Sequence, residues 1–439
     1  MAMVVKNNMS AVSTLNTLNR NSAALTKSLA KVSSGMRVNG AADDASGYAI
    51  SERMRVQIRS LDQDNRNTQN GSSMMKVAEG AVSSTVEILK TLKEKVINAA
   101  NDSNTDEDRQ TIQKELNQSL DQIDDNANMT YNGKYLVDGT KNNKTNATCT
   151  HLTNMALSTD TTSSTKLTAL KNRTGDELHI SSTDNVTISY VNQGKTYTTT
   201  FSVGQNTLSS MVSNRVATYG TVSYTASFGF STDNVIGTDG TMNTVYTANR
   251  ENGITLQNGA SGVDTQIAGL TISISDNTGA IKKAANAALD AFSESIRAQN
   301  ASEDNALVFQ TGTKANQAIK VGLTDMRTEA LGLKGSDGTK LNISTQKFAN
   351  AAINVLDNAL QKALDQQTTI GAVQSRMEYA SSNLVAASEN VTASESTIRD
   401  ADMAKEMTEY TKNNVLLQAA QSMLAQANQS SSSVLSLLQ

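Results

Sequence analysis

The sequence predicts a mainly α-helical protein with a β-rich insertion, in which long antiparallel coiled-coil helices come from the N- and C-terminal segments. Three observations support this fold class. Both ends of the chain carry apolar residues spaced three and four apart, which is the period of a helical seam. The middle of the chain instead alternates apolar and polar residues, as a half-buried strand does. The 439 residues include no proline, so no proline interrupts a long helix by removing a backbone N–H donor.

The two ends of the chain each predict one seam. The N-terminal seam consists of Val4, Ala11, Leu15, Leu18, Leu25, Leu29, Val32 and Met36. The C-terminal seam consists of Met403, Met407, Tyr410, Leu417, Leu424, Leu435 and Leu438. Residues 7–19 and all residues after Lys412 lack charged side chains, whereas a free surface helix normally carries Lys and Glu. We therefore expect both ends to be buried among other helices.

Further seams predict helices between the ends. They comprise Ala78, Val82, Val86, Leu89, Leu92 and Val96; Ile112, Leu116, Leu120 and Ile123; and Ile370, Val373, Met377, Ala380, Leu384, Ala387 and Val391. One terminal pair of helices buries only a narrow apolar stripe, against the conformational entropy of ordering every residue in it. We therefore expect the ends to fold fully only when neighbouring copies of the chain cover them.

The middle region, residues 141–280, predicts strands. Residues 186–203 indicate a β-hairpin whose turn is Asn192–Lys195, because apolar and polar residues alternate on both sides of it. The segments "SYTASFGF" and "LTISI" indicate further strands. Residues 281–299, in contrast, indicate one amphipathic helix.

Composition argues against several function classes. The net charge of −4 gives no basic excess for nucleic acid or anionic lipid. A single cysteine, Cys149, cannot form an intrachain disulfide, and a tolerated surface thiol is the simpler interpretation of it. His151 and His179 lack the spacing of a metal site or catalytic triad, and no phosphate-binding glycine motif occurs. We expect no enzyme activity, no cofactor and no bound metal. No secretory signal or membrane span is evident, so we expect the chain to be cytoplasmic or to leave the cell by another route.

Several motifs in both ends resemble those of one known family. The N-terminal part contains "SSGMRVNGAADDASGYAISERMR" and "TYNGKYLVDG"; the C-terminal part contains "LTDMRTEALGL", "IGAVQSRMEYASSNL" and "IRDADMAKEMTEYTKNNVLLQAAQSMLAQANQSSSSVLSLLQ". Together they resemble the terminal signatures of bacterial flagellin, the filament subunit of the flagellum. The resemblance covers about residues 1–140 and 303–439, and residues 141–302 match nothing recognisable.

The resemblance implies a layered subunit and an extracellular location. Residues 1–40 with 396–439 would form the inner core of terminal helices, 41–140 with 303–395 a surrounding helical domain, and 141–302 a variable surface-exposed domain. Assembly would depend on Leu15, Leu18, Leu25, Leu29, Val32, Leu417, Leu424, Leu435 and Leu438. The chain would be exported unfolded by the flagellar type III apparatus, form a homopolymer, contact hook-associated and cap proteins, and offer its C-terminal helix to an export chaperone.

The polar stretch 33–50 then becomes the joint between two layers. We expect a helix to end near Ser34–Gly35, a link at Asn39 and Gly40, and an N-cap for the next helix at Asp43 or Asp44. Two alternatives concern the same aspartates. They could ligate a cation, although no further acidic residues follow at the spacing of a calcium loop, or they could pair with Arg37 or Arg53 of the same or a neighbouring copy.

The resemblance also concerns innate immunity. Flagellins detected by the vertebrate receptor carry an Arg, a Leu and a Gln on one helical face, where this chain places Thr91, Lys95 and Asn98. Loss of an interface Arg typically costs about 2 kcal/mol or more. We therefore expect weak activation of that receptor. Rival interpretations are the hook–filament junction protein, a coiled-coil surface adhesin, and an enzyme on a helical stalk.

Overall fold

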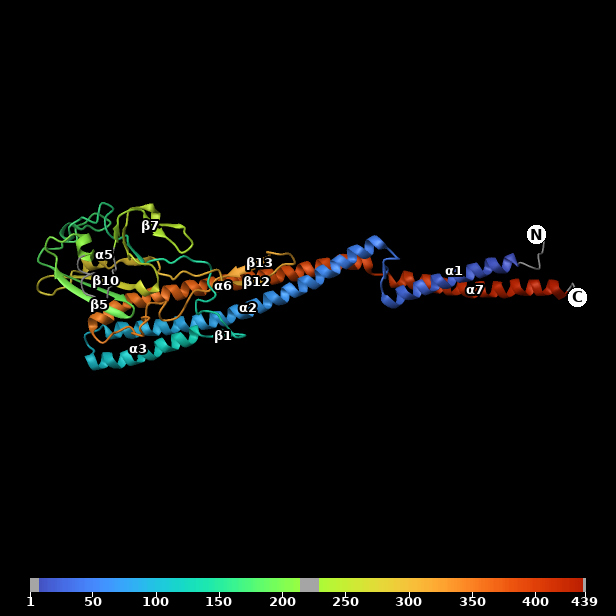
Figure 1. Cartoon of the computed structure of the whole chain (residues 1–439), viewed down its shortest axis with the longest axis horizontal. Coiled ribbons are helices and arrows are strands. Elements are labelled where there is room, and N and C mark those ends of the chain that lie inside the picture. The colour runs from blue at the N-terminus through green and yellow to red at the C-terminus, as the bar shows by residue number, and fades with distance from the viewer. Residues whose placement is uncertain (1–7, 214–228, 437–439) are drawn as a thin grey trace. The chain divides into compact units, whose positions relative to one another are not determined.

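The computed structural model describes residues 8–213 and 229–436, and it confirms a mainly helical chain with a β-containing middle region (Figure 1). The helices are α1 (Met9–Ser34), α2 (Ala45–Ala99), α3 (Asp106–Ala127), α4 (Leu208–Ser213), α5 (Lys283–Leu289), α6 (Gln346–Arg399) and α7 (Met403–Ser436), with 3-10 turns at Leu167–Ala169, Ala248–Arg250 and Val263–Thr265. None of the helices in this described part is long and apolar enough to cross a lipid bilayer.

The strands lie between α3 and α6, and most are short. They are β1 (Thr130–Tyr131), β2 (Lys134–Tyr135), β3 (His151–Asn154), β4 (Asn185–Asn192), β5 (Lys195–Ser202), β6 (Gly229–Ser231), β7 (Val235–Thr238), β8 (Thr244–Tyr246), β9 (Ile254–Gln257), β10 (Ile267–Ser275), β11 (Phe292–Ile296), β12 (Leu307–Gln310) and β13 (Ala318–Val321).

The chain divides into two compact units. The terminal unit lies within Met1–Thr68, Gln310–Gln317 and Tyr379–Gln439, and the middle unit lies within Gln69–Phe309 and Ala318–Glu378. Helices α2 and α6 each contribute one part to each unit. The expected division into three domains stays a prediction, because a compact unit of one chain does not define a layer of an assembly.

In the terminal unit, α1 and α7 run antiparallel and side by side (Figure 1). Helix α1 begins where the side chain of Asn8 accepts a hydrogen bond from the N–H of Ala11. It ends at Gly35, whose φ of 69° is a left-handed conformation that glycine adopts without strain. The predicted end of this helix near Ser34–Gly35 is therefore confirmed.

Two of the inner seams lie at the core of the helical part of the middle unit, and the third, on α6, is buried there at Ile370, Val373 and Met377 before it continues into the terminal unit. All six residues of the seam from Ala78 to Val96 are at most 3% exposed, and Leu116, Leu120 and Ile123 are at most 1% exposed. Helix α2 contacts α6 through an ion pair between Lys93 and Asp357. Periodicity alone identified these helices because the apolar stripe and the buried face coincide.

Antiparallel sheets form the remaining part of the middle unit. One sheet has the strand order β10-β4-β5, and another has the order β11-β3-β9-β6. The predicted hairpin is β4 and β5, which pair from Asn185 and Ser202 to Asn192 and Lys195. Its turn residues, Gln193 and Gly194, have φ values of 49° and 72°, as a two-residue hairpin turn with the right-handed strand twist requires. The predicted "LTISI" strand is part of β10.

The prediction of one helix over residues 281–299 is wrong. Only α5 is helical there, and it packs its alanine face on β10. The following residues form β11, which pairs with β3 in register from Phe292 and Asn154. Pairing with β3 satisfies the backbone groups of this segment, and this tertiary context overrides the local helical pattern. Most of the "SYTASFGF" segment lies outside the described residues, and its last two residues belong to β6.

Candidate functional site

Polar contacts fix the pairing of α1 with α7. The contacts are Asn8 Nδ2 to the Ala427 carbonyl (3.2 Å), Asn21 Nδ2 to the Leu416 carbonyl (3.2 Å), Asn413 Nδ2 to Ser28 Oγ (2.9 Å) and Lys31 Nζ to Glu406 (3.3 Å). As the residue number increases along α1, the residue number of the partner on α7 decreases, as in an antiparallel pair. These side chains define one register, because a shift of either helix by one residue would separate all four contacts.

Only part of each predicted terminal seam lies between the two helices. Leu18, Leu25 and Val32 are half-buried, and they share one face of α1 with Asn21 and Ser28, which contact α7. On α7, Leu417 and Leu424 are also half-buried. The side chain of Leu435 and the whole of Leu438 lie outside the described part of the chain.

Several other apolar residues in the described parts of α1 and α7 face solvent. Leu15 is 45% exposed and Leu29 is 50% exposed, so neither lies in the contact between α1 and α7. Among the described side chains of α7, the exposed large apolar ones are Met403, Met407, Val415, Leu416 and Met423. A shallow hollow on α7 is lined by Met407, Thr408, Thr411, Lys412, Val415 and Leu416. The single chain thus leaves apolar surface uncovered on helices that are largely uncharged.

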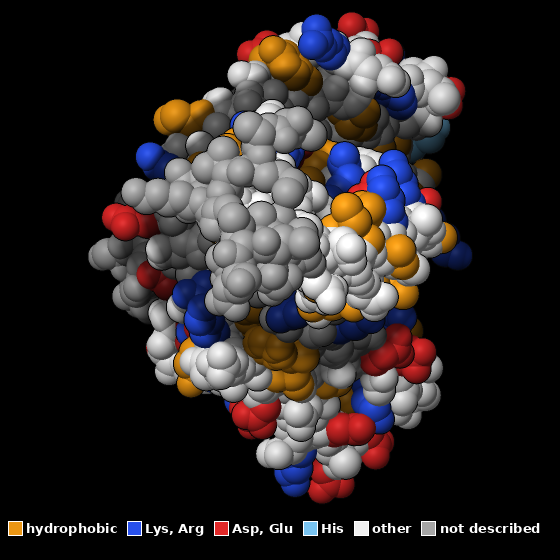
Figure 2. All heavy atoms as spheres, turned by 90° about the vertical axis from the view of Figure 1, so that its right-hand side faces the viewer, with side chains coloured by type: hydrophobic (Ala, Val, Ile, Leu, Met, Phe, Trp, Pro, Cys, Tyr) orange, Lys and Arg blue, Asp and Glu red, His pale blue; other side chains and the backbone are white. Residues whose placement is uncertain are grey.

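Acidic, basic and apolar side chains are interspersed on the face shown in Figure 2, and among the described residues there neither sign of charge forms a continuous patch. This mixed surface agrees with the small net charge of the sequence.

A short backbone pairing connects the ends of α1 and α6. Met36 and Asp400 form an isolated antiparallel bridge, and the N–H of Arg37 donates to the carbonyl of Arg399 over 2.7 Å. Val38, which follows directly, is only 2% exposed. The polar joint after α1 is thus held against the start of the C-terminal segment, although some 360 residues separate them in sequence.

Arg399 is the centre of this joint. Its guanidinium forms an ion pair with Glu52 over 2.7 Å, donates from Nε to Met36 Sδ over 3.1 Å, and lies 5.5 Å from the centre of the Tyr48 ring. Only 7% of the Arg399 side chain is exposed. The hydrogen bond from Arg399 lowers the pKa of the Glu52 carboxyl below its usual value. Arg399, the last residue of α6, therefore contacts both the segment that follows α1 and the first turns of α2.

Asp44 caps α2, as one of the two predicted alternatives requires. Its Oδ1 accepts from the N–H groups of Ser46 over 3.1 Å and Gly47 over 2.9 Å. Asp43 instead accepts from the N–H of Asn39 over 3.2 Å, which closes the link between the two helices. The two adjacent aspartates thus have different tasks.

Within the chain, Asp43 pairs with a lysine and not with either predicted arginine. Lys27 Nζ lies 2.9 Å from Asp43 Oδ1, and this contact lowers the pKa of the Asp43 carboxyl. Arg37 donates to the carbonyl of Ile398 over 2.5 Å. The Arg53 side chain makes no hydrogen bond or ion pair with any other described residue. Pairing of these arginines with a neighbouring copy of the chain stays a prediction.

The three residues related to receptor recognition lie on α2 in the middle unit. Thr91 Oγ1 donates to the backbone of its own helix, and Lys95 forms an ion pair with Glu115 over 2.7 Å. Asn98 accepts hydrogen bonds from the side chain of Asn104 through its carbonyl and its Oδ1. All three side chains therefore already have partners within the chain.

Sequence reasoning missed Arg399 as a site residue. Its neighbours Glu52, Tyr48 and Met36 lie more than 340 positions away, so no local spacing connects them. The available signal was its position, because Arg399 is the last residue of α6 and directly precedes the acidic "DAD" before α7. A basic residue at a helix C-terminus is common, and this observation alone does not distinguish a joint from an ordinary cap.

Comparisons with known proteins point to one family. The model of the bacterial flagellin N-terminal helical region matches residues 5–142, and that of the C-terminal helical region matches residues 353–438. The chain is 33% identical to a flagellin of Clostridium tyrobutyricum, over 97% of this chain and 99% of the relative. It is 30% identical to a flagellin of Bacillus subtilis (strain 168), over 99% of this chain and 100% of the relative.

Solved structures show a more distant likeness. The flagellar junction protein FlgL from Legionella pneumophila aligns with a TM-score of 0.33 and 16% identity, over 80% of this chain and 99% of that one. FliC from Burkholderia pseudomallei aligns with a TM-score of 0.26 and 16% identity, over 70% of this chain and 99% of that one. Scores this low carry no argument about function.

Proposed function

The chain belongs to the bacterial flagellin family, and we propose that the exposed apolar residues of α1 and α7 are the surface through which identical copies pack together. As a member of this structural family, the chain is a subunit of the flagellar filament. The observation that supports the proposal is the exposure of Leu15 and Leu29 on a helix whose first eleven residues carry no charge. Covering such residues with neighbouring helices removes apolar area from water.

The proposed packing has two levels. Leu18, Leu25, Val32, Leu417 and Leu424 would hold α1 to α7 within one copy, whereas Leu15 and Leu29 would contact other copies. In the filament, residues 1–40 with 396–439 would form the core, 41–140 with 303–395 a surrounding layer, and 141–302 the outer domain. The contacts of Arg399, Asp43 and Asp44 support a joint between the first two layers.

Further partners follow from family membership as proposals. We propose that the chain is exported by the flagellar type III apparatus, that α7 binds an export chaperone through its exposed apolar side chains, and that the filament ends contact hook-associated and cap proteins outside the cell. We also propose weak activation of the vertebrate flagellin receptor, since Thr91, Lys95 and Asn98 replace the residues that the receptor contacts in other flagellins. No catalytic role is proposed.

Charge substitution on the exposed faces tests the assembly surface. Leu29→Asp and Met423→Asp would each place a carboxylate in a surface that closes on assembly, so we expect the critical concentration for polymerisation to rise at least about tenfold. The matched control is Met242→Asp, since Met242 is 73% exposed in the middle region and Met423 is 62% exposed on α7. The measurement is the sedimentable fraction of purified full-length chain, with electron microscopy of the polymer.

Two outcomes would count against the proposal. Normal filaments from both Leu29→Asp and Met423→Asp would show that these residues are not at a contact between copies. Failure of the unsubstituted chain to form filaments longer than a few turns would favour the hook–filament junction protein instead. Circular dichroism of the monomers should show the same helix content for all variants, because the substituted side chains are exposed.

A further inference from the structure

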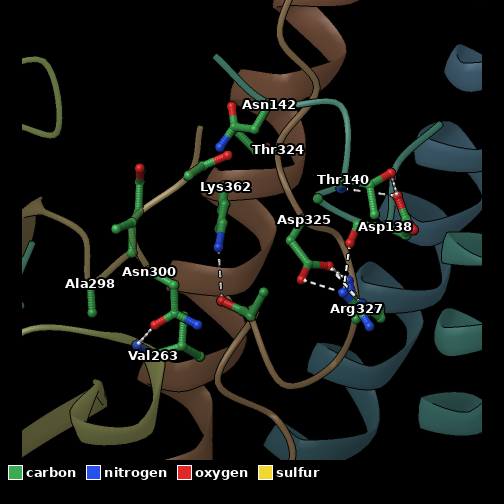
Figure 3. Close-up of a pocket in the computed structure, with 15 residues that line it drawn as sticks. Asp138, Thr140, Asn142, Val263, Ala298, Asn300, Thr324, Asp325, Arg327 and Lys362 are labelled. Atoms are coloured by element: carbon green, nitrogen blue, oxygen red, sulfur yellow. Dashed lines mark hydrogen bonds and ion pairs between the residues drawn. The ribbon is translucent and has the colours of Figure 1, made fainter. Parts of the chain in front are cut away.

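A cavity of about 240 Å³ lies in the middle unit, where residues 298–302 meet the loops 138–142 and 324–330 (Figure 3). Figure 3 shows Lys362 pointing from α6 into this space, with Asn142 and Thr324 on one side and Asn300 on another. Pockets for drug-sized ligands typically measure about 300–1,000 Å³. This cavity therefore fits a smaller molecule, and nothing in filament assembly assigns a role to it.

Lys362 brings unused hydrogen-bond donors to the cavity. Its side chain is 8% exposed, and Nζ donates to the carbonyl of Ala330 over 2.8 Å. An ammonium group has three N–H bonds. The other two meet no hydrogen-bond acceptor among the described residues, so the cavity contains a buried cationic donor with capacity for a ligand.

Two asparagines add donors of the same kind. Asn300 Oδ1 accepts from the N–H of Val263 over 3.0 Å, and Asn142 Oδ1 accepts from the N–H of Asn143 over 2.8 Å. These backbone donors require an oxygen, which fixes the orientation of both side-chain amides. Each Nδ2 group is therefore left without an acceptor in the described part of the chain, while both residues line the cavity.

The carboxylate of Asp325, which is paired with Arg327, supplies hydrogen-bond acceptors on another wall of the cavity. Arg327 Nη2 lies 3.2 Å from Asp325 Oδ2 and donates to the carbonyl of Asp138 over 2.6 Å. Gly139, with a φ of 82°, permits this close approach, because a β-carbon there would lie 2.8 Å from Asp325 Cβ. Asp325 Oδ1 also accepts from the N–H of Arg327 over 2.9 Å and from Arg327 Nε over 3.2 Å. The Asp325 side chain is 31% exposed, which leaves acceptor capacity chiefly on Oδ2.

The charges around the cavity disfavour a charged ligand. Lys362 and Arg327 are balanced by Asp138 and Asp325 among the lining residues. An anion would be repelled by the two carboxylates, and a cation would be repelled by the ammonium and the guanidinium. A hydroxyl group both accepts and donates, so adjacent hydroxyls can accept from Lys362 and the asparagines while donating to Asp325.

From this lining we propose that the cavity binds an uncharged polyhydroxylated molecule the size of one sugar unit. The proposal goes beyond filament assembly, since it assigns a ligand site to the boundary between the β-rich part and the helical part of the middle unit. Each lining donor and the accessible carboxylate then has a hydroxyl partner. Binding requires no change in covalent structure.

The test uses the full-length chain as a monomer and ligand-observed NMR. The probes are glucose, galactose, mannose and N-acetylglucosamine, with acetate, phosphate and glycine as charged comparators. We expect saturable binding of at least one sugar. Lys362→Met should weaken it about tenfold or more, and Asn300→Ala about two- to tenfold, since each substitution removes hydrogen bonds to the ligand.

Controls separate this site from binding elsewhere. Asn342→Ala is the matched variant, because Asn342 Oδ1 also accepts a backbone hydrogen bond, from Ser344 over 2.8 Å, but lies outside the cavity. Its affinity should equal that of the unsubstituted chain. Asn300 is exposed, so Asn300→Ala keeps the test valid even if Lys362→Met does not fold.

Three results would overturn the proposal. The first is saturable binding of the charged comparators only. The second is sugar binding that neither Lys362→Met nor Asn300→Ala changes. The third is no saturable binding of any probe at concentrations well above millimolar, which would mean that water alone fills the cavity.

Discussion

Gly47 stands in the first turn of α2 because the cap of that helix leaves no room for a larger residue. Asp44 accepts from the N–H of Gly47, and a β-carbon at position 47 would collide with the Asp44 carboxylate. An alanine would ordinarily stabilise a helix relative to glycine. Here it would displace the capping side chain.

Gly47→Ala should therefore destabilise the start of α2. Loss of an N-cap typically costs about 1 kcal/mol, which would offset or exceed the helical gain of the alanine. We expect hydrogen-exchange protection of residues 45–60 to fall, as it should in Asp44→Ala. Gly80→Ala is the control within the same helix, since a β-carbon there meets no atom within 4 Å. Increased protection of residues 45–60 in Gly47→Ala would show that Asp44 does not act as a cap.

Glu294 is a second residue whose surroundings determine its chemistry. Its side chain is 3% exposed, and its Oε1 has no hydrogen-bond partner in the described part of the chain. Burial raises the pKa of Glu294 to about 7, although Arg297 and Lys362 favour the charged form. In the unfolded chain the glutamate pKa is near 4.5.

The free energy of unfolding of the middle unit should consequently fall as pH rises from about 4.5 to about 7. Between the unfolded and folded pKa values the folded state binds the proton more tightly, so the free energy of unfolding decreases with pH until the folded group is ionised. We expect the melting temperature of the monomer to drop on the order of a few degrees between pH 5 and pH 8 from this group. Glu294→Gln should flatten that dependence, and Glu303→Gln, at an exposed position, should not. An unchanged slope in Glu294→Gln would refute the assignment.

At the scale of elements, the joint depends on one side chain that three segments share. The Arg399 guanidinium contacts Glu52 on α2, Met36 in the link and the Tyr48 ring. Arg55 also contacts Glu52, over 3.3 Å, but its side chain is 39% exposed. Glu52 is 40% exposed in both pairs, so the difference lies in the arginines: only 7% of the Arg399 side chain is exposed, and water screens it less than it screens Arg55.

Arg399→Met should lower the melting temperature of repolymerised filaments clearly more than Arg55→Met. We expect the larger drop in melting temperature for Arg399→Met, because its guanidinium is largely buried whereas that of Arg55 is exposed. Arg399→Lys should lie between them, since an ammonium keeps the charge but cannot reproduce the planar contacts. Calorimetry of the filaments measures all three, and equal melting of Arg399→Met and Arg55→Met would remove Arg399 from the joint.

At the scale of the molecule, burial differs sharply between the two units. The seam of α2 from Ala78 to Val96 is almost wholly buried within one chain, whereas Leu15 and Leu29 on α1 are about half exposed. Local stability follows the apolar contacts that a segment makes. The isolated chain should therefore have a stable middle unit and weakly protected terminal helices.

Hydrogen exchange should distinguish the stable middle unit from the weakly protected terminal helices. In the monomer, we expect amides of residues 9–34 and 403–436 to exchange much faster than those of residues 78–96. In the filament, exchange in both terminal segments should slow by at least about a hundredfold if neighbouring copies supply a few kcal/mol of stability there. Strong protection of the terminal helices in the monomer would contradict the idea that they fold on assembly.

Much of the helical fold followed from local pattern. The seams of α2 and α3, the end of α1 at Gly35 and the β4–β5 hairpin were all predictable, because three-four spacing, a left-handed glycine and a two-residue turn act over a few residues. The β11 strand was not, since its backbone partner β3 lies more than 130 residues away. Periodicity also could not show that, within the α1 seam, Leu18 is half-buried whereas Leu29 is exposed.

The sequence by itself determined which segments become long helices, that they are amphipathic, where α1 ends, and to which family the terminal motifs belong. These properties depend on neighbours along the chain and on residue types. Only the tertiary structure decided that Arg399 joins Glu52 and Met36, that Asp43 pairs with Lys27, and that Lys362 reaches a cavity beside Asn300. Those contacts connect residues distant in sequence, and the energy that fixes them exists only after the helices and sheets have packed.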